Sequence, residues 1–193
     1  LFTACGLGHE GVVRLLLAHD KINVNQATTD KTDVNQARME DGATPLFIAC
    51  QQGHVEVVRL LLADDKTNVN QARTTDGSTP LIDACQQGHE EVVRLLLAHA
   101  ETDVNQAETD GSTPLIDACL EGHKEVVRLL LAHDKTNVNQ ARTRYGTGPL
   151  WMACSNGHVE VVNILLEHPR INIFQIDTDG KTPLTMSLIH ISE

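Results

Sequence analysis

The 193-residue chain has few aromatic side chains, few basic side chains and no long apolar run. Aromatic residues make up 3% of it, so a core must be built from aliphatic side chains, and the apolar share of 41% is enough for one. Lys and Arg number 15 against 26 Asp and Glu, which gives a formal net charge of −11. That charge repels phosphate backbones and anionic lipids, and no segment approaches the roughly 20 apolar residues of a membrane span. We therefore expect neither a nucleic-acid partner nor membrane insertion.

The five cysteines do not fit a disulfide framework, because their number is odd. They recur once per repeating unit, as described next, and stacked helical units place equivalent residues roughly 8–10 Å apart. A disulfide requires Cα atoms within roughly 7 Å. We expect free thiols and a reducing location in the cytoplasm or elsewhere inside the cell.

Internal repetition is the strongest feature of the sequence, and three markers share its period. A Gly-His element precedes an apolar run at intervals of 45, 35, 34 and 35 residues, at His9, His54, His89, His123 and His158. A Pro-Leu pair recurs at Pro45, Pro80, Pro114, Pro149 and Pro183. An Ala-Cys pair recurs at Cys5, Cys50, Cys85, Cys119 and Cys154. The chain is therefore a series of similar units of about 34 to 35 residues.

Each unit predicts a pair of helices followed by a polar finger. Thr44 is a suitable N-cap for a first helix, and Leu46, Ala49 and Cys50 form one apolar stripe on it. Gly53 ends this helix in the left-handed conformation. Residues 57–62 form a second, apolar helix, and residues 64–77 carry turn-forming residues. Neither helix can bury its apolar face alone, so the units must stack into an all-α repeat solenoid.

The pattern resembles the ankyrin repeat, whose units contain T-P-L-H-x-A, G-H-x-E-V-V-x-L-L-L and D-V-N elements. The resemblance implies stacked helix-turn-helix units with β-hairpin or loop fingers, in a single array of about five and a half units. The expected units are residues 1–41, 42–76, 77–110, 111–145, 146–179 and a partial unit at 180–193. The family His after Thr-Pro-Leu is replaced here, at Phe47, Ile82, Ile116, Trp151 and Thr185, so we expect apolar packing in its place.

The resemblance also implies a binding surface for another protein, made from the fingertips and the ends of the first helices. The expected fingertip residues are Glu40, Asp41, Thr75, Asp76, Thr109 and Asp110. The expected first-helix residues are Gln51, Gln52, Gln86, Gln87, Leu120 and Glu121.

One unit departs from the others and is the expected centre of this surface. Tyr145 stands where other units have Asp, Arg144 precedes it, Gly148 replaces the Thr cap and Trp151 follows. Tyr, Trp and Arg are enriched among residues that dominate binding energy. Trp151 also fits a packing role, because its place is taken by Ile or Phe elsewhere.

Two further features have open interpretations. Residues 83–125 carry ten acidic and two basic side chains, whereas residues 126–158 carry four basic and one acidic. Such a division either steers a partner into register or is ordinary solvated surface. The finger before Ala43 contains a ten-residue duplication within residues 24–37, which is either a recognition loop or a neutral insertion.

No arrangement in the sequence supports catalysis, a cofactor or a metal. Gly6, Gly8 and Gly11 spell a G-x-G-x-x-G motif, but at a helix–helix turn rather than after a strand. The recurring Cys and His, four residues apart, are interpreted as a small buried thiol and a turn-stabilising imidazole. Asp83 and Asp117 are interpreted as a partly exposed acidic ladder, and no catalytic residue is expected.

The sequence therefore predicts a non-catalytic, monomeric scaffold that binds another protein. The alternative is a regulatory module from a larger enzyme or channel. An engineered scaffold is a third interpretation, although the uneven repeat lengths do not look idealised. Membership of the family would also allow hydroxylation of the finger asparagines Asn35, Asn70, Asn105 and Asn139.

Overall fold

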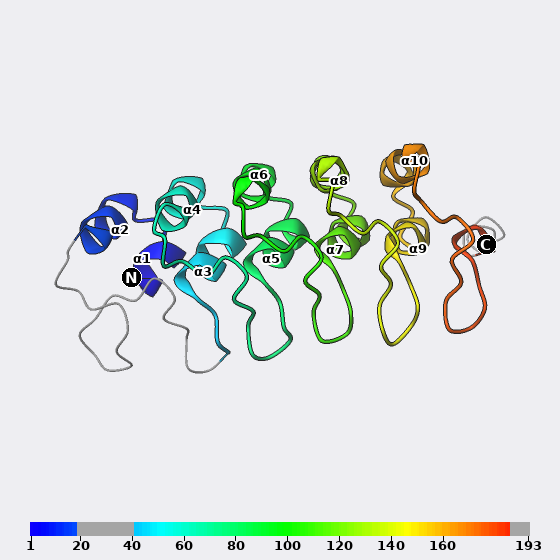
Figure 1. Ribbon diagram of the computed structural model, residues 1–193, viewed down its shortest axis with the longest axis horizontal. Helices are drawn as coiled ribbons and strands as arrows, with labels where there is room; N and C mark the ends of the chain where they lie inside the picture. Colours follow the sequence, from blue (N-terminus) through cyan, green and yellow to red (C-terminus); the bar gives the residue numbers. More distant parts are fainter. Residues whose placement is uncertain (19–40, 186–193) are drawn as a thin grey trace. The chain divides into compact units, whose positions relative to one another are not determined.

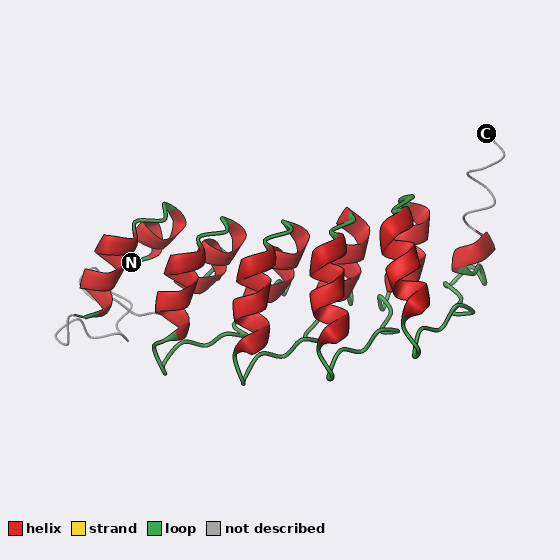
Figure 2. Ribbon diagram, turned by 90° about the horizontal axis from the view of Figure 1, so that it is seen from above, coloured by secondary structure: helices red, strands yellow, loops and turns green. Residues whose placement is uncertain are grey.

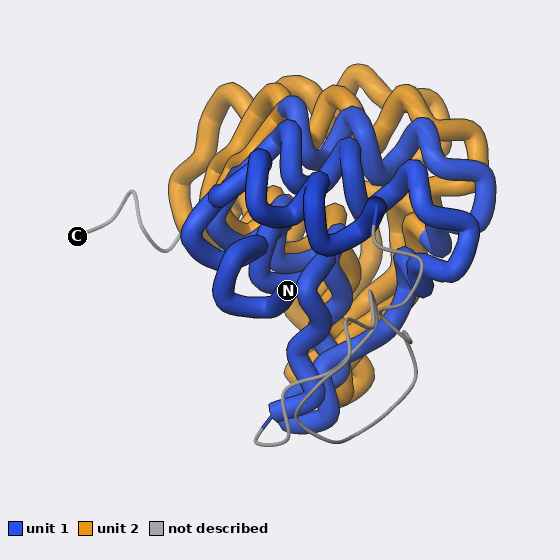
Figure 3. Tube along the Cα trace, turned by 90° about the vertical axis from the view of Figure 1, so that its left-hand side faces the viewer, with its two compact units in different colours: residues 1–84, 91–103 blue, residues 85–90, 104–193 orange. Residues whose placement is uncertain are grey.

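The structure is a computed structural model that describes residues 1–18 and 41–185. Within this part of the chain there are helices and loops but no strands (Figure 2). The chain divides into two compact units (Figure 3). The first takes in residues 1–84 and 91–103, and the second takes in residues 85–90 and the residues from 104 onward.

Both units consist of helix pairs. The first unit contains α1 (Phe2–Gly6), α2 (Glu10–Leu17), α3 (Pro45–Gln51), α4 (Val55–Leu62), most of α5 (Pro80–Gln86) and α6 (Glu90–Ala98). The second contains α7 (Pro114–Glu121), α8 (Lys124–Ala132), α9 (Pro149–Ser155) and α10 (Val159–Glu167). In each unit the first helices of the pairs lie side by side, and the finger loops extend from them, away from the second helices (Figure 1).

This architecture confirms the predicted all-α repeat solenoid. The fingers are loops, one of the two forms that the resemblance implied. In the finger before α5, the amide of Arg73 donates to the carbonyl of Ser78 at 2.8 Å, and the amide of Gly77 donates to the carbonyl of Arg73 at 3.0 Å. The finger thus closes on itself with a tight hydrogen-bonded turn.

The predicted helix signals are confirmed in the first helices. The hydroxyl of Thr44 accepts from the amide of Phe47 at 3.1 Å, as expected of an N-cap, and Gly53 has φ of 72° after α3. Gly148 stands in place of the Thr cap before α9, and nothing in the structure explains this substitution.

Aliphatic side chains form the core, as the low aromatic content required. Leu46, Ala49 and Cys50 on α3 are buried, and so are the α4 residues Val58 and Leu61. Each helix pair packs this face against the next pair, with α1 against α3 and α2 against α4 in the first unit, and α7 against α9 and α8 against α10 in the second. Burial of such side chains contributes roughly 1.5–3 kcal/mol each.

The recurring histidine hydrogen-bonds to the end of the first helix in the preceding helix pair. Nε2 of His54 hydrogen-bonds to the carbonyl of Gly6, 3.1 Å away in the preceding helix pair. In the second unit, Nε2 of His158 makes the same bond to the carbonyl of Leu120 at 2.8 Å. The imidazole therefore joins neighbouring pairs and satisfies a carbonyl at the end of a first helix.

Asparagines in the fingers join neighbouring repeats in the same way. In the first unit, Nδ2 of Asn70 donates to the carbonyl of Glu101 at 2.6 Å, and its Oδ1 accepts from the amide of Asp103 at 2.9 Å. In the second unit, Asn139 donates to the carbonyl of Arg170 at 2.7 Å and accepts from the amide of Asn172 at 2.8 Å. One side chain thus satisfies a donor and an acceptor of the following loop, and we call this arrangement the asparagine clamp.

Some expectations fall on residues 19–40 and 186–193, which lie outside the described part of the chain. These are the duplication at residues 24–37, the binding residue Glu40 and the modification candidate Asn35. In the described part, no helix combines the length and the apolar character that crossing a membrane requires.

The asparagine clamp should contribute measurably to stability. Asn139→Ala removes two hydrogen bonds between repeats and should lower the free energy of unfolding by about 1–3 kcal/mol, since each such bond is worth roughly 0.5–1.5 kcal/mol. Urea unfolding followed by circular dichroism measures this. Asn163→Ala, at an exposed position on α10, is the matched control and should cost nothing. Equal unfolding midpoints for the two variants would contradict a structural role for the clamp.

Candidate protein-binding surface

The fingers of each unit are joined to one another by backbone hydrogen bonds. In the first unit, the amide of Thr74 donates to the carbonyl of Asp41 at 2.8 Å. In the second unit, the amide of Thr143 donates to the carbonyl of Asp110 at 3.0 Å. The amide of Thr178 donates to the carbonyl of Tyr145 at 2.9 Å. A row of fingers joined in this way presents its tips in a fixed register.

A glycine at each of these junctions permits the close approach. Gly111 has φ of +88°, and a Cβ built on it would lie 2.5 Å from the amide nitrogen of Thr143. Any other residue would therefore force the two fingers apart.

Three of the acidic fingertip residues that we expected lie in the described part of the chain, and their side chains also hold the fingers in shape. Oδ1 of Asp41, Asp76 and Asp110 accepts from the backbone amide two residues further on, at 3.1, 3.0 and 2.8 Å. All three are half-buried, whereas Thr75 and Thr109 beside them are exposed. The acids thus stabilise the turns, and the threonines are the more accessible part of the tips.

Hydrogen bonding keeps two of these carboxylates ionised. Burial acts to raise the pKa of Asp76, but hydrogen bonds from the Arg73 side chain and the amide of Ser78 outweigh it and lower the pKa. At Asp110 burial also acts to raise the pKa, and hydrogen bonds from Ser112 lower it. Both carboxylates are therefore ionised at neutral pH.

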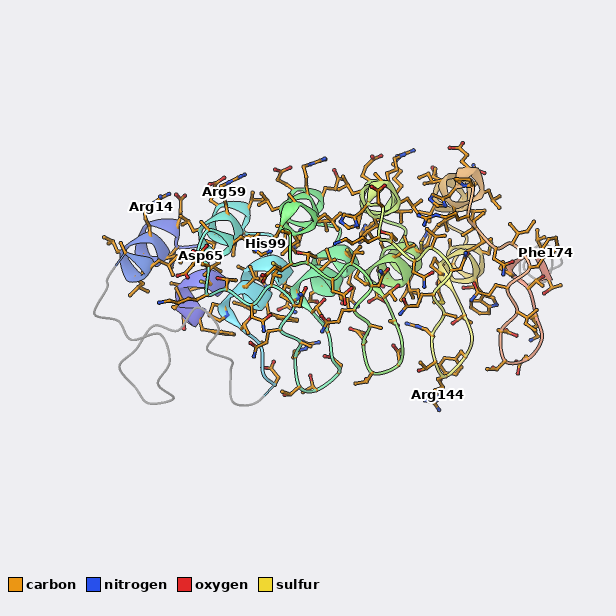
Figure 4. The ribbon with its side chains drawn as sticks, in the orientation of Figure 1. Arg14, Arg59, Asp65, His99, Arg144 and Phe174 are labelled. Atoms are coloured by element: carbon orange, nitrogen blue, oxygen red, sulfur yellow. The ribbon has the colours of Figure 1, made fainter. Side chains whose placement is uncertain are left out.

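Arg144 and Tyr145 are both exposed at a fingertip of the second unit, where other fingers carry the turn-forming Asp. Tyr145 is 45% exposed, and the guanidinium carbon of Arg144 lies 5.2 Å from the centre of its ring. Figure 4 shows Arg144 at the far end of its finger, directed away from the helices. The pair presents a stacked aromatic and cationic group to the solvent.

Trp151, the third residue of the expected centre, lies at the base of the same finger on α9. It is half-buried and lines a cavity of about 320 Å³ together with Tyr145 and Asp177. Its indole nitrogen is buried and has no hydrogen-bond partner within the described residues. The structure thus brings Tyr145 and Trp151 to one cavity.

The expected first-helix residues differ in accessibility. Gln52, Gln86, Gln87 and Glu121 are exposed and Leu120 is half-buried. Gln51 is half-buried, and its amide donates to Oδ2 of Asp83 at 3.0 Å in the neighbouring helix pair. Its side chain is therefore directed into the stack.

The buried carboxyls of Asp83 and Asp117 correct the prediction of a partly exposed acidic ladder. They are only 2% and 4% exposed. Burial raises the pKa of Asp117 to about 8, helped by the negative charge of Glu108 and opposed by Arg142, while Asp110 and Glu121 raise it further. Asp117 is therefore mostly protonated at neutral pH, and it carries no exposed charge.

The five thiols are free, as predicted. Burial raises the pKa of Cys5 to about 11, and burial together with the charge of Asp83 raises that of Cys50. These thiols stay protonated at neutral pH and are poor nucleophiles and poor metal ligands. No group of three or more potential metal ligands occurs within residues 1–18 and 41–185.

The raised pKa of Asp117 predicts a pH-dependent stability. The folded protein binds this proton more tightly than the unfolded chain, in which the carboxyl has its ordinary pKa. The stabilisation is complete below that ordinary pKa and is lost as the pH rises to about 8. Asp117→Asn stays neutral, so its advantage over the wild type should grow between pH 5 and pH 8 by on the order of 1 kcal/mol per pH unit. Urea unfolding at several pH values measures it.

The control for this experiment is Asp134→Asn, at an exposed position. Its stability should differ from the wild type by the same amount at every pH. A parallel pH dependence for Asp117→Asn and the wild type would show that Asp117 titrates normally.

Comparison with known families agrees with the repeat architecture. A family model described as ankyrin repeats (3 copies) matches residues 1–73, 64–142, 100–177 and 134–191. A search of curated proteins gives no match. Ankyrin repeats are generally protein–protein interaction modules and are generally non-catalytic. The matches extend over nearly the whole length, and the chain belongs to the ankyrin repeat family.

Proposed function

We propose that this protein is a non-catalytic scaffold that binds a partner protein through its fingertips and the exposed ends of its first helices. The observation that carries the proposal is the exposed stack of Arg144 and Tyr145 on a finger that is hydrogen-bonded to its neighbours. A fingertip offers little to pack against, so an aromatic ring held there is available for an interface. Preorganised contacts of this kind lose little entropy on binding.

The other contact residues are those whose side chains remain accessible on the same surfaces. These are the exposed Thr75, Thr109, Gln52, Gln86, Gln87 and Glu121 and the half-buried Asp41, Asp76, Asp110, Gln51 and Leu120. The half-buried acids contribute charge, while the exposed residues contribute hydrogen bonds. We further propose that the array acts as a monomer inside the cell, where its thiols stay reduced.

The alternative in which the array regulates a neighbouring catalytic or channel domain uses the same surface. The two proposals differ in whether the partner is a separate protein or a part of the same polypeptide. We favour a separate partner, because the exposed fingertip stack suits an intermolecular interface.

Removal of the fingertip stack tests the proposal. The partner is first captured by cross-linking from the native source, and its affinity is then measured by isothermal titration calorimetry. The double substitution Arg144→Ala and Tyr145→Ala should weaken binding about 10-fold or more, as expected when two residues of a hot spot are truncated.

The matched control is Arg128→Ala, which removes one positive charge from the exposed face of α8, where Arg128 pairs with Glu125. It should change the affinity less than twofold. Equal affinities of the double variant and the control would remove Arg144 and Tyr145 from the binding surface.

A further inference from the structure

The cavity beside Trp151 is a feature of the second unit that the fingertip proposal does not explain. Its volume is about 320 Å³, and its walls include Arg142, Tyr145, Trp151, Asp177, Asp179 and Lys181. One wall is thus aromatic, and the rim carries both carboxylates and cations. It is large enough for one amino-acid side chain.

The first unit shows what fills the corresponding place in another repeat. The guanidinium carbon of Arg73 lies 4.9 Å from the centre of the Phe47 ring, and the guanidinium group pairs with Asp76. Phe47 is only 1% exposed. The arginine of one finger therefore covers the aromatic ring of the first helix before it, and its charge is balanced by a carboxylate of the same finger.

The repeat that contains Trp151 keeps an aromatic ring but lacks the arginine. Trp151 occupies the position of Phe47 in its repeat, and Asp177 follows Pro149 by the same 28 residues that separate Arg73 from Pro45. Asp177 has no guanidinium group to place over the indole, and Trp151 is half-buried beside a cavity. The arginine that covers the ring in the repeat of Phe47 is therefore replaced by an aspartate in the repeat of Trp151.

The two cationic side chains near the cavity, those of Arg142 and Lys181, do not take the place that Arg73 takes over Phe47. The side chain of Arg142 is mostly buried, and its Nε donates to the hydroxyl of Ser112 at 2.7 Å. Nζ of Lys181 lies 4.0 Å from Oδ2 of Asp179, on the exposed side of the finger. Oδ1 of Asp177 accepts from the amides of Asp179 and Lys181, at 2.9 and 2.8 Å.

We infer that this cavity binds an arginine side chain of the partner protein. The guanidinium group stacks on the indole of Trp151 as Arg73 stacks on Phe47, and the carboxylates of Asp177 and Asp179 balance its charge. Arginine suits this place better than lysine, because its planar group stacks on a ring and pairs with a carboxylate at the same time. The inference rests on the proposed function and specifies which chemical group of the partner that surface recognises.

Trp151 gives a direct readout, because it is the only tryptophan in the chain. The full-length protein is titrated with the blocked tripeptide acetyl-Gly-Arg-Gly-amide while the emission of Trp151 is recorded. Peptides with lysine, citrulline or glutamate in place of arginine are compared with it. We expect a saturable change with arginine and an affinity about fivefold or more above that of citrulline, which has a similar shape without the charge. An equal response to citrulline, or a stronger one to glutamate, would overturn the inference.

Variants of Asp177 locate the binding to the cavity. Asp177→Arg restores from within the chain the side chain found in the first unit, and it should abolish the response to the arginine peptide. Asp177→Asn retains an oxygen for the turn and should weaken the response several-fold. Asp134→Arg makes the same change of charge at an exposed position and should leave the response intact. Circular dichroism verifies that each variant is folded, and a full response from folded Asp177→Arg would overturn the inference.

The captured partner separates this inference from the proposed function. Partner binding that is weakened by Asp177→Arg and by removal of Arg144 and Tyr145 supports both. Binding that is weakened by the fingertip variant but unaffected by Asp177→Arg overturns the arginine site and leaves the proposed function standing. The third outcome is that the arginine peptide gives a response but the fingertip variant binds the partner normally. This outcome supports the arginine site in the cavity and counts against Arg144 and Tyr145 as the centre of the binding surface.

Discussion

Each helix pair in this protein has an apolar face that only another helix pair can cover. Val12 and Val57 occupy the same place in successive repeats of the first unit, yet Val12 is 48% exposed and Val57 is 1% exposed. The sequence around them is nearly identical, so the difference arises from α1 and α2, which precede Val57 and have no described counterpart before Val12. Burial is therefore shared between repeats, and a single repeat cannot be stable on its own.

This constraint explains where the sequence is uniform and where it varies. The histidine that reaches the preceding carbonyl and the asparagine clamp both act between repeats, so they recur with the apolar residues that they accompany. Fingertip side chains make few such contacts. Tyr145 replaces an aspartate without disturbing the junction, because the bond to Thr178 uses the backbone carbonyl, which every residue possesses. Binding residues can change at the tips while the stack is preserved.

Most of the fold could be predicted from the sequence, because its signals are local and are repeated. The cap at Thr44 and the left-handed Gly53 depend on residues only a few positions away. The burial of Asp117 could not be predicted, because a carboxylate is usually exposed and its loss of charge depends on surrounding elements. The partner of Gln51 could not be predicted for a similar reason, since Asp83 lies 32 residues away in the sequence.

The candidate site was predicted in its residue types but not in its geometry. Arg144, Tyr145 and Trp151 stood out as departures from the repeat, whereas Asp177 did not, because an aspartate in a polar finger is unremarkable by itself. Its meaning depends on the comparison with Arg73, which covers Phe47 in the first unit. In a repeat protein, one repeat can show which side chain of the same chain fills a given position. Where another repeat lacks that side chain, the position is left for a side chain of the partner. A binding site can therefore arise when a contact within the chain is lost, without any new structural element.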